Sequence, residues 1–223
     1  MPGAMPPKCE RGRMKDDAKH TQLNVANWDR WAESFDGGGW VHRYLRDCQS
    51  KVISLLDVKE DIHFLDVGCG TGWAIREAAT LFNNKGLFYG IDLSPKMIEK
   101  AKENFSGKEN LHFIKANAES IPLDGDFFDI IICTNSFHHY LHPDRVMNEF
   151  YRLLKKGGKV YILDATTDAW YMKIIDRIMK LLESGFVKFY STKEYQQLFQ
   201  NAGLKYSASK KIKSNNKVHI AEK

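Results

Sequence analysis

The sequence predicts an α/β fold of the doubly wound type, a three-layer sandwich in which helices cover both faces of a mainly parallel sheet. Three observations indicate it. Short apolar segments alternate with segments of helical periodicity between residues 62 and 163, as in repeated strand–helix–strand units. The first apolar segment runs into a glycine-rich turn, and the second ends in an aspartate. The length of 223 residues and the 43% of apolar residues suit one domain with a substantial core.

The N-terminal part of the chain divides into a polar tail and a helical cap. Residues 1–20 are polar and mixed in charge, with three prolines. We expect residues 1–23 to be a disordered tail, which could include residues added for expression, and residues 24–223 to form a single domain. Residues 24–60 are expected to form an N-terminal helical cap, because tryptophans and a phenylalanine lie at helical spacing before a run of glycines and a second amphipathic segment follows.

The alternating part of the chain supplies five strands and the helices between them. The strands are expected at residues 62–67, 87–91, 111–116, 128–133 and 159–163. The helices are expected at residues 73–83, at residues 95–105 after the capping residue Ser94, and from Pro143 to the Gly157-Gly158 pair. In a parallel sheet of this kind, ligands bind beyond the carboxyl ends of the strands.

The last third of the chain departs from this alternation. Residues 168–184 have helical periodicity with apolar residues on more than one face, and aromatic residues continue to 190. We interpret residues 168–190 as a helical insertion whose second apolar surface could line a pocket, although core packing or a dimer contact would explain the composition equally well. Ser191 and Glu194 have the spacing of a capping box, and residues 204–212 and 218–221 are expected to form a hairpin.

The glycine-rich turn within residues 64–74 carries the strongest functional signal. Gly68, Gly70 and Gly72 permit positive φ angles and allow a ligand to approach the backbone. The helix after the turn directs its free N–H groups toward the same place, which favours an anionic group. A dinucleotide-binding turn needs a third glycine three positions after the second one, and Trp73 stands there. This position disfavours a nicotinamide-dependent oxidoreductase.

Together with Asp92, which ends the second strand, the turn resembles the class I S-adenosylmethionine-dependent methyltransferases. Their first motif is similar to residues 65–72 and their second to residues 90–94, and the resemblance covers about residues 25–223. It implies S-adenosyl-L-methionine as cofactor, S-adenosyl-L-homocysteine as product, and a Rossmann-like sheet of seven strands in the order 3-2-1-4-5-7-6 with the last strand antiparallel. The resemblance is to the small-molecule branch that includes the ubiquinone and menaquinone methyltransferases.

The resemblance also implies which residues bind the cofactor. The methionine end is expected near Asp66 and the glycine turn, the ribose near Asp92, and the adenine edge near Asn117, where the family more often has aspartate. A turn residue without a ligand is the alternative for Asn117. The expected cofactor-binding residues are Asp66, Gly68, Cys69, Gly70, Gly72, Asp92, Leu93, Met97, Asn117, Ala118, Glu119, Thr134 and Phe35. The resemblance implies that Phe35 forms a lid with Trp31, and packing of these aromatic residues on the sheet is the alternative.

Two adjacent histidines after the fourth strand, His138 and His139, are the candidate catalytic residues. A histidine could act as general base if the acceptor is a hydroxyl or an acidic carbon, and a wall residue beside the cofactor is the alternative. His138 and His142 have the spacing of metal ligands, but only Asp144, beyond a proline, could join them. We therefore predict no metal site.

Composition and charge limit the partners. The net charge of +5 is mild, and the five lysines between Lys205 and Lys217 are expected on a solvated hairpin rather than on nucleic acid or an anionic membrane. The four cysteines lack C-x-x-C spacing, which indicates free thiols in a reducing cytoplasm. No apolar segment approaches the roughly 18 residues of a membrane span. No signal peptide is expected at residues 1–20.

These observations predict a cytoplasmic methyltransferase that acts on a small-molecule acceptor with an apolar or aromatic body. A homodimer is a candidate assembly. The resemblance implies that the insertion of residues 168–190 lies over the acceptor side, and Trp170 and Met172 are then expected to line the acceptor pocket. The alternative function is a sensor or assembly protein that binds S-adenosylmethionine on the same fold without catalysis.

Overall fold

The computed structural model describes residues 8–32, 37, 39–57, 59–183 and 185–223, with side chains from residue 17 onward. A seven-stranded sheet with the order β3-β2-β1-β4-β5-β7-β6 confirms the expected fold. The first five strands pair in parallel, and β7 lies antiparallel between β5 and β6. The strands are β1 (Ile62–Val67), β2 (Gly86–Asp92), β3 (Leu111–Lys115), β4 (Phe128–Thr134), β5 (Leu154–Ala165), β6 (Lys205–Lys213) and β7 (Asn216–Glu222).

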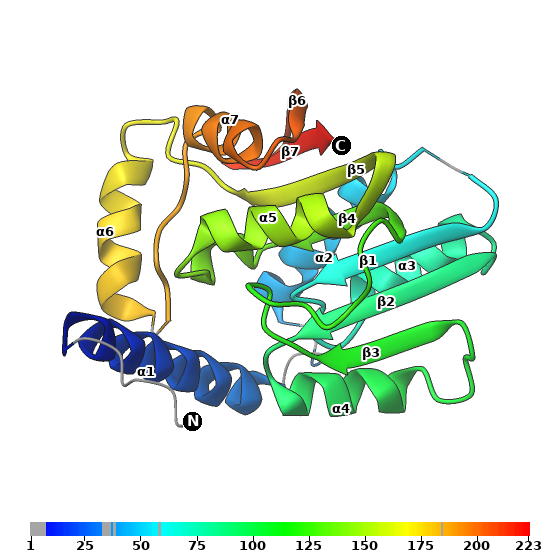
Figure 1. Ribbon diagram of the computed structural model, residues 1–223, viewed down its shortest axis with the longest axis horizontal. Helices are drawn as coiled ribbons and strands as arrows, with labels where there is room; N and C mark the ends of the chain where they lie inside the picture. The colour runs from blue at the N-terminus through cyan, green and yellow to red at the C-terminus, as the bar shows by residue number, and fades with distance from the viewer. Residues whose placement is uncertain (1–7, 33–36, 38, 58, 184) are drawn as a thin grey trace, which may run out of the picture.

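Helices cover both faces of the sheet and complete the sandwich (Figure 1). They are α1 (Lys8–Trp31), α2 (Trp40–Ile53), α3 (Trp73–Leu81), α4 (Pro95–Asn104), the 3-10 turn η1 (Phe137–His139), α5 (Pro143–Leu153), α6 (Met172–Leu182) and α7 (Thr192–Asn201). Because successive strand residues point to opposite faces, Phe64 joins a core with α2 and α3, whereas Leu65 joins a second core with α5 and α7. The sheet thus separates two cores.

Local sequence signals account for several element boundaries. The Ser94 hydroxyl accepts from the Met97 N–H at the start of α4, and Pro95 occupies the first helical position. At the start of α7, the capping box predicted from Ser191 and Glu194 is present, with the Ser191 N–H donating to the Glu194 carboxylate at 2.8 Å. These caps satisfy N–H groups that a helix leaves unpaired at its start.

Two predicted boundaries are wrong by several residues. The Gly157-Gly158 pair does not end a helix, because α5 stops at Leu153 and β5 begins at Leu154. The Gly157 N–H donates to the Lys223 carbonyl (2.9 Å), and the Lys223 N–H donates to the Gly158 carbonyl (3.0 Å), so the glycines extend the sheet. The α6 helix begins at Met172 rather than at residue 168, since the Asp168 carboxylate accepts from the Thr192 N–H of α7 (2.8 Å).

The expectation of a disordered tail over residues 1–23 is wrong for residues 8–23, which form most of α1; residues 1–7 lie outside the described part. The helix lies across the carboxyl ends of the parallel strands, with one end below α6 and the other beside α4 (Figure 1). His20 bonds to the His139 carbonyl (Nε2–O 3.1 Å), and Asp29 accepts from the Ser94 hydroxyl. A helix held by polar contacts does not need a stripe of apolar residues along one side. Residues 8–23 therefore lack the apolar periodicity from which a helix is predicted.

Within the described ranges, no helix combines the length and the apolar character that crossing a membrane requires.

Candidate functional site

A cavity of about 790 Å³ lies at the carboxyl ends of the parallel strands, where α1, α2 and α6 also approach. Most of the predicted site residues line it. They are Gly68, Cys69, Gly70, Asp92, Leu93, Met97, Asn117, Ala118, Glu119, Thr134, His138 and His139. Asp66 and Gly72 are not part of the lining, and Phe35 lies outside the described residues. The volume is within the range of small-molecule sites in proteins.

The glycine turn forms one end of the cavity and is attached to the neighbouring strand. The Gly68 and Cys69 N–H groups both donate to the Ile91 carbonyl, at 2.9 and 3.0 Å. Gly68 has φ +78°, and a Cβ at this position would lie 2.2 Å from the Ser136 Oγ. The turn therefore needs glycine here both for the backbone angle and for the space.

Asp92 connects the turn to the next helix. Its Oδ2 accepts from the Gly70 N–H and its Oδ1 from the Ser94 N–H, both at 2.9 Å. Burial raises the pKa of this carboxyl, although the two backbone donors act in the opposite direction. The carboxylate thus fixes the geometry of the turn and also lines the cavity.

Asp66 lies behind the turn with an unusual environment. The side chain is 1% exposed, and its Oδ1 has no hydrogen-bond partner among the described residues. Burial, and secondly the charge of Asp92, raise the pKa of Asp66 to about 8. A buried carboxyl oxygen without a partner, next to a turn open to a ligand, is a group that a cationic ligand would satisfy.

Asn117 adopts the turn role that the sequence left open for it. Its side-chain oxygen accepts from the Glu119 N–H at 2.9 Å, which closes a tight turn. That oxygen is therefore already engaged, while Glu119 itself accepts from the His142 N–H (3.3 Å). The Asn117 oxygen retains a second lone pair and the residue lines the cavity, so its role toward the adenine edge stays a prediction.

The opposite side of the cavity carries the two candidate histidines on η1. His138 Nδ1 donates to Asp164 at 2.8 Å, and the His138 backbone N–H donates to the same carboxylate at 3.0 Å. Burial alone would lower the pKa of His138, but the Asp164 carboxylate outweighs it and raises the pKa above its usual value. In the neutral ring, the Asp164 carboxylate keeps the proton on Nδ1, which leaves Nε2 as the atom that can accept one.

His139 has a different environment. Its Nδ1 donates to the Gly185 carbonyl at 3.1 Å, and Trp28 of α1 packs edge-on against its ring. Burial, followed by the neighbouring His138, holds the pKa of His139 well below its usual value, so the ring is neutral. Its Nε2 lies 3.4 Å from Glu183 Oε1 without forming a hydrogen bond.

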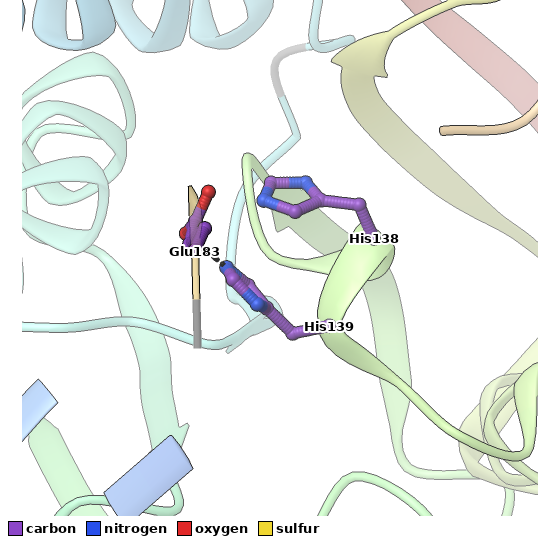
Figure 2. A group of neighbouring side chains, drawn as sticks. All are labelled: His138, His139 and Glu183. Atoms are coloured by element: carbon purple, nitrogen blue, oxygen red, sulfur yellow. Dashed lines mark ion pairs between the residues drawn. The ribbon is translucent and has the colours of Figure 1, made fainter. Parts of the chain in front are cut away.

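His138, His139 and Glu183 are the described side chains grouped closely enough to hold a metal ion, with ligand atoms within 4.8 Å of one another (Figure 2). This is not the grouping weighed from the sequence, because His142 Nε2 instead lies 3.1 Å from Asp17 of α1. The same geometry can also share a proton between His139 and Glu183, so the cluster does not by itself specify a metal site.

Several cavity residues were not predicted from the sequence. Asp164, Glu183 and Gln49 lie in the lining, and Gln49 donates to the Thr134 hydroxyl at 2.9 Å. The sequence could have indicated Asp164, because this aspartate comes directly after the predicted fifth strand (residues 159–163). Asp92 stands in the same way at the end of the second strand. In the insertion, Met179 and Leu182 line the cavity, whereas the expected Trp170 and Met172 do not.

Comparisons with known proteins agree with this architecture. The family model described as a methyltransferase domain matches residues 58–203. A ubiquinone/menaquinone biosynthesis C-methyltransferase, UbiE of Campylobacter jejuni, is 34% identical over 127 residues, which cover 53% of this chain and 50% of that protein. The uncharacterized methyltransferase YcgJ of Bacillus subtilis is 27% identical over 159 residues, 70% of this chain and 62% of that protein. The chain thus spans about half of the first relative and less than two thirds of the second.

A solved structure shares the fold over most of its length. It is a chain of the complex between the Haloferax volcanii Trm112 methyltransferase activator and a methyltransferase. The TM-score is 0.76 and the sequence identity 20%, and the match covers 89% of this chain and 96% of that chain. The sheet order, the glycine turn with its acidic strand end, and the family match over more than half of the chain lead to one assignment. The chain belongs to the class I S-adenosylmethionine-dependent methyltransferase family.

Proposed function

We propose that this protein transfers a methyl group from S-adenosyl-L-methionine to a small-molecule acceptor. The observation that carries the proposal is a single cavity lined at one end by the glycine turn and Asp92 and at the other by His138 and Asp164. Such an arrangement allows two ligands to be held side by side with their reacting atoms in contact. The fold and the family imply the cofactor.

The residues at the turn suit this cofactor. Glycine at position 68 lets the turn pack against Ser136, whose Oγ a Cβ would meet at 2.2 Å, and it keeps the turn at the cavity wall. Behind this turn, the unpartnered Asp66 oxygen would accept from the ammonium group at the methionine end. Asp92, which faces the cavity, would accept hydrogen bonds from ribose hydroxyls. The bound cofactor supplies an electrophilic methyl group with a neutral leaving group. The protein's task is to align the acceptor with that methyl group and to exclude water.

Of the two histidines, His138 is the better general base. Asp164 accepts from its Nδ1, which fixes the tautomer and would stabilise the imidazolium after proton uptake, as in other carboxylate–histidine pairs. His139 lacks a bonded carboxylate at its ring, and its lowered pKa makes it a weak proton acceptor. His138 Nε2 would therefore take the proton of an acceptor hydroxyl or acidic carbon, and His139 would form the wall.

The lining favours an acceptor with an apolar or aromatic body. Trp28 and Trp31 come from α1, and Met179 and Leu182 from α6, all on the acceptor side. The C-methyltransferase of Campylobacter jejuni is named for ubiquinone and menaquinone biosynthesis, which is consistent with such a substrate class. We further propose a cytoplasmic location, where the buried thiols of Cys48, Cys69 and Cys133 would stay reduced.

Thermal unfolding with two ligands tests the cofactor. S-adenosyl-L-homocysteine at about 100 times its dissociation constant should add about 2.7 kcal/mol to the free energy of unfolding, and NAD should add nothing. Stabilisation by NAD alone would contradict the proposal. A methyl-transfer screen over quinols, phenols, amines and thiols then identifies the acceptor class. Binding of S-adenosyl-L-homocysteine without turnover of any acceptor would favour the alternative of a non-catalytic sensor or assembly protein.

A further inference from the structure

The α6 helix stands at the edge of the molecule, away from the sheet and between α1 and α7 (Figure 1). Its inward side makes the contacts that hold it. Met172 is 4% exposed, and Asp176 Oδ1 accepts from the Phe189 N–H at 2.7 Å. One turn further, Met179 lines the cavity. At 3.6 residues per turn these positions form one narrow sector of the helix.

A second sector of α6 is apolar and exposed. At about 100° per residue, Ile174, Ile175, Ile178, Leu181 and Leu182 occupy about 120° of the helix circumference, opposite or beside the inward sector. With Trp170 of the preceding turn, these side chains are 38% to 87% exposed. A contiguous exposed patch of large apolar side chains marks a surface that a partner protein or a membrane covers.

The third sector of α6 is basic and borders the apolar one. Lys173, Arg177 and Lys180 lie on the same side of the helix, and all three are exposed. The single acid of the helix, Asp176, lies on the inward sector, where it also pairs with Lys180 at 3.0 Å. The outer surface of α6 therefore combines apolar side chains with positive charge.

This charge pattern distinguishes between two partners that could cover the apolar sector, a second copy of the chain and a membrane surface. A second copy of the chain would bring an identical basic sector beside the first, with no acid on the outer surface of α6 to pair with it. An anionic lipid surface offers the opposite charge at the rim and an apolar interior beneath it. We propose that α6 docks the protein onto the surface of an anionic membrane, with its apolar sector at the boundary of the acyl chains.

The position of the cavity gives this docking a consequence for the substrate, which rests on the proposed function. Leu182 belongs both to the exposed sector and to the cavity lining, and Trp31 and Val41 on the same cavity are 43% and 37% exposed. The apolar rim of the cavity is thus continuous with the docking sector. The acceptor would then be a lipid-soluble molecule that enters from the membrane.

Sedimentation with lipid vesicles tests the docking without using catalysis. The full chain should bind phosphatidylcholine vesicles that contain phosphatidylserine much more tightly than vesicles of phosphatidylcholine alone. The triple variant Lys173→Gln, Arg177→Gln, Lys180→Gln should bind the anionic vesicles about 100-fold more weakly, because each cation near such a surface contributes a factor of about five. The variant Ile174→Ser, Ile178→Ser, Leu181→Ser should lose binding to both vesicle types.

The matched control removes the same charge elsewhere. The variant Lys205→Gln, Lys210→Gln, Lys211→Gln on β6 should bind vesicles like the unchanged protein, since these exposed lysines lie on the hairpin. A cooperative thermal unfolding transition with a midpoint like that of the unchanged protein shows that each variant is folded. Failure of the unchanged protein to sediment with either vesicle, or equal weakening by the β6 control, overturns the docking. So does a dimer in solution that the apolar variant splits. None of these outcomes depends on methyl transfer, so the proposed function stands or falls separately.

Discussion

The two sides of the cavity are built in opposite ways. On the proposed cofactor side, Gly68 and Gly70 follow β1 and Asp92 ends the adjacent β2, and their contacts involve backbone groups such as the Gly70 N–H, which donates to Asp92 at 2.9 Å. On the proposed acceptor side, His138, Asp164 and Glu183 come from three separate segments, and the contact that orients the His138 ring joins two side chains, its Nδ1 and the Asp164 carboxylate. The first side is a short local structure, whereas the second exists only when distant segments meet.

This difference predicts how substitutions on the two sides behave. A surface of backbone N–H groups depends on φ angles and space, so a change there should disturb cofactor binding and the turn together. A surface of side chains can be altered one residue at a time while the backbone stays in place. We therefore expect cofactor-side variants to lose affinity for S-adenosyl-L-homocysteine and acceptor-side variants to lose turnover with that affinity unchanged.

The largest effect is expected on the acceptor side, from His138→Gln. If His138 removes the acceptor's proton, kcat should fall by about 10²- to 10⁴-fold while S-adenosyl-L-homocysteine still binds. The matched control is His142→Gln, because His142 lies outside the cavity lining and contacts Asp17. A folded His138→Gln variant with unchanged kcat would show that His138 is a wall residue.

The pH profile sharpens the same prediction. A base acts when it is deprotonated, and Asp164 raises the pKa of His138, so turnover should rise with pH through a midpoint above the usual value of about 6.5. In Asp164→Asn the neutral amide no longer stabilises the imidazolium, and the midpoint should move to lower pH. A midpoint that does not move would contradict the positioning role of Asp164.

The next effect is expected on the cofactor side, from Gly68→Ala. The new Cβ would lie 2.2 Å from Ser136 Oγ on a backbone with φ +78°. We expect the free energy of unfolding to fall by about 2–4 kcal/mol and calorimetry to show weaker S-adenosyl-L-homocysteine binding. Gly107→Ala is the control for the backbone angle, since Gly107 has φ +79° with nothing within 4 Å of its Cβ position. Equal losses in the two variants would mean that the space at Gly68 is unimportant.

Asp92→Ala should weaken S-adenosyl-L-homocysteine binding by about 1.5–3 kcal/mol, because a charged acceptor for ribose hydroxyls is lost. The same variant should also be less stable, since the Gly70 and Ser94 N–H groups lose their acceptor. Calorimetry and urea unfolding measure the two effects, with Asp57→Ala as a surface control. Unchanged affinity in a folded Asp92→Ala variant would place the ribose elsewhere.

Asp66 should make the ligand-free protein less stable as pH rises. Its folded pKa of about 8 lies above the roughly 3.9 of an unfolded aspartate, so the unfolded state releases the proton first. Stability is therefore retained below about pH 4, declines between about pH 4 and 8, and is lowest above, by on the order of 5 kcal/mol. Asp66→Asn should lack this decline in urea unfolding. If the free energies of unfolding of Asp66→Asn and the unchanged protein depend on pH in the same way, the pKa of Asp66 is not raised in the folded protein.

The smallest effect is expected from Met179→Ser, which alters the acceptor wall. KM for a water-soluble acceptor should rise several-fold, since about 1 kcal/mol of apolar contact is lost, while S-adenosyl-L-homocysteine affinity stays the same. Ile174→Ser, on the outer sector of the same helix, should leave both quantities unchanged. If Met179→Ser weakens cofactor binding instead, α6 belongs to the cofactor side.

The fold and the turn at the proposed cofactor side could be predicted in large part from the sequence and its family resemblance. The order of the strands, the glycine turn, Asp92 and the capping residue Ser94 were all expected and are present. Their geometry depends on neighbours in the chain, because glycine permits positive φ, serine caps a helix, and a parallel strand ends where its turn begins. The sequence by itself therefore determined the fold class, the family and one half of the cavity.

Only the tertiary structure decided the other half. Asp164 reaches His138, and Glu183 reaches His139, from segments 26 and 44 residues away in the chain. The oxygen of Asn117 is used by its own turn, and α1 is ordered by polar and aromatic contacts with η1. No periodicity or motif encodes these contacts, because each depends on where a distant backbone runs once the sheet has formed. For the same physical reason, the three sectors of α6 could be assigned only when the structure showed which of them faces inward.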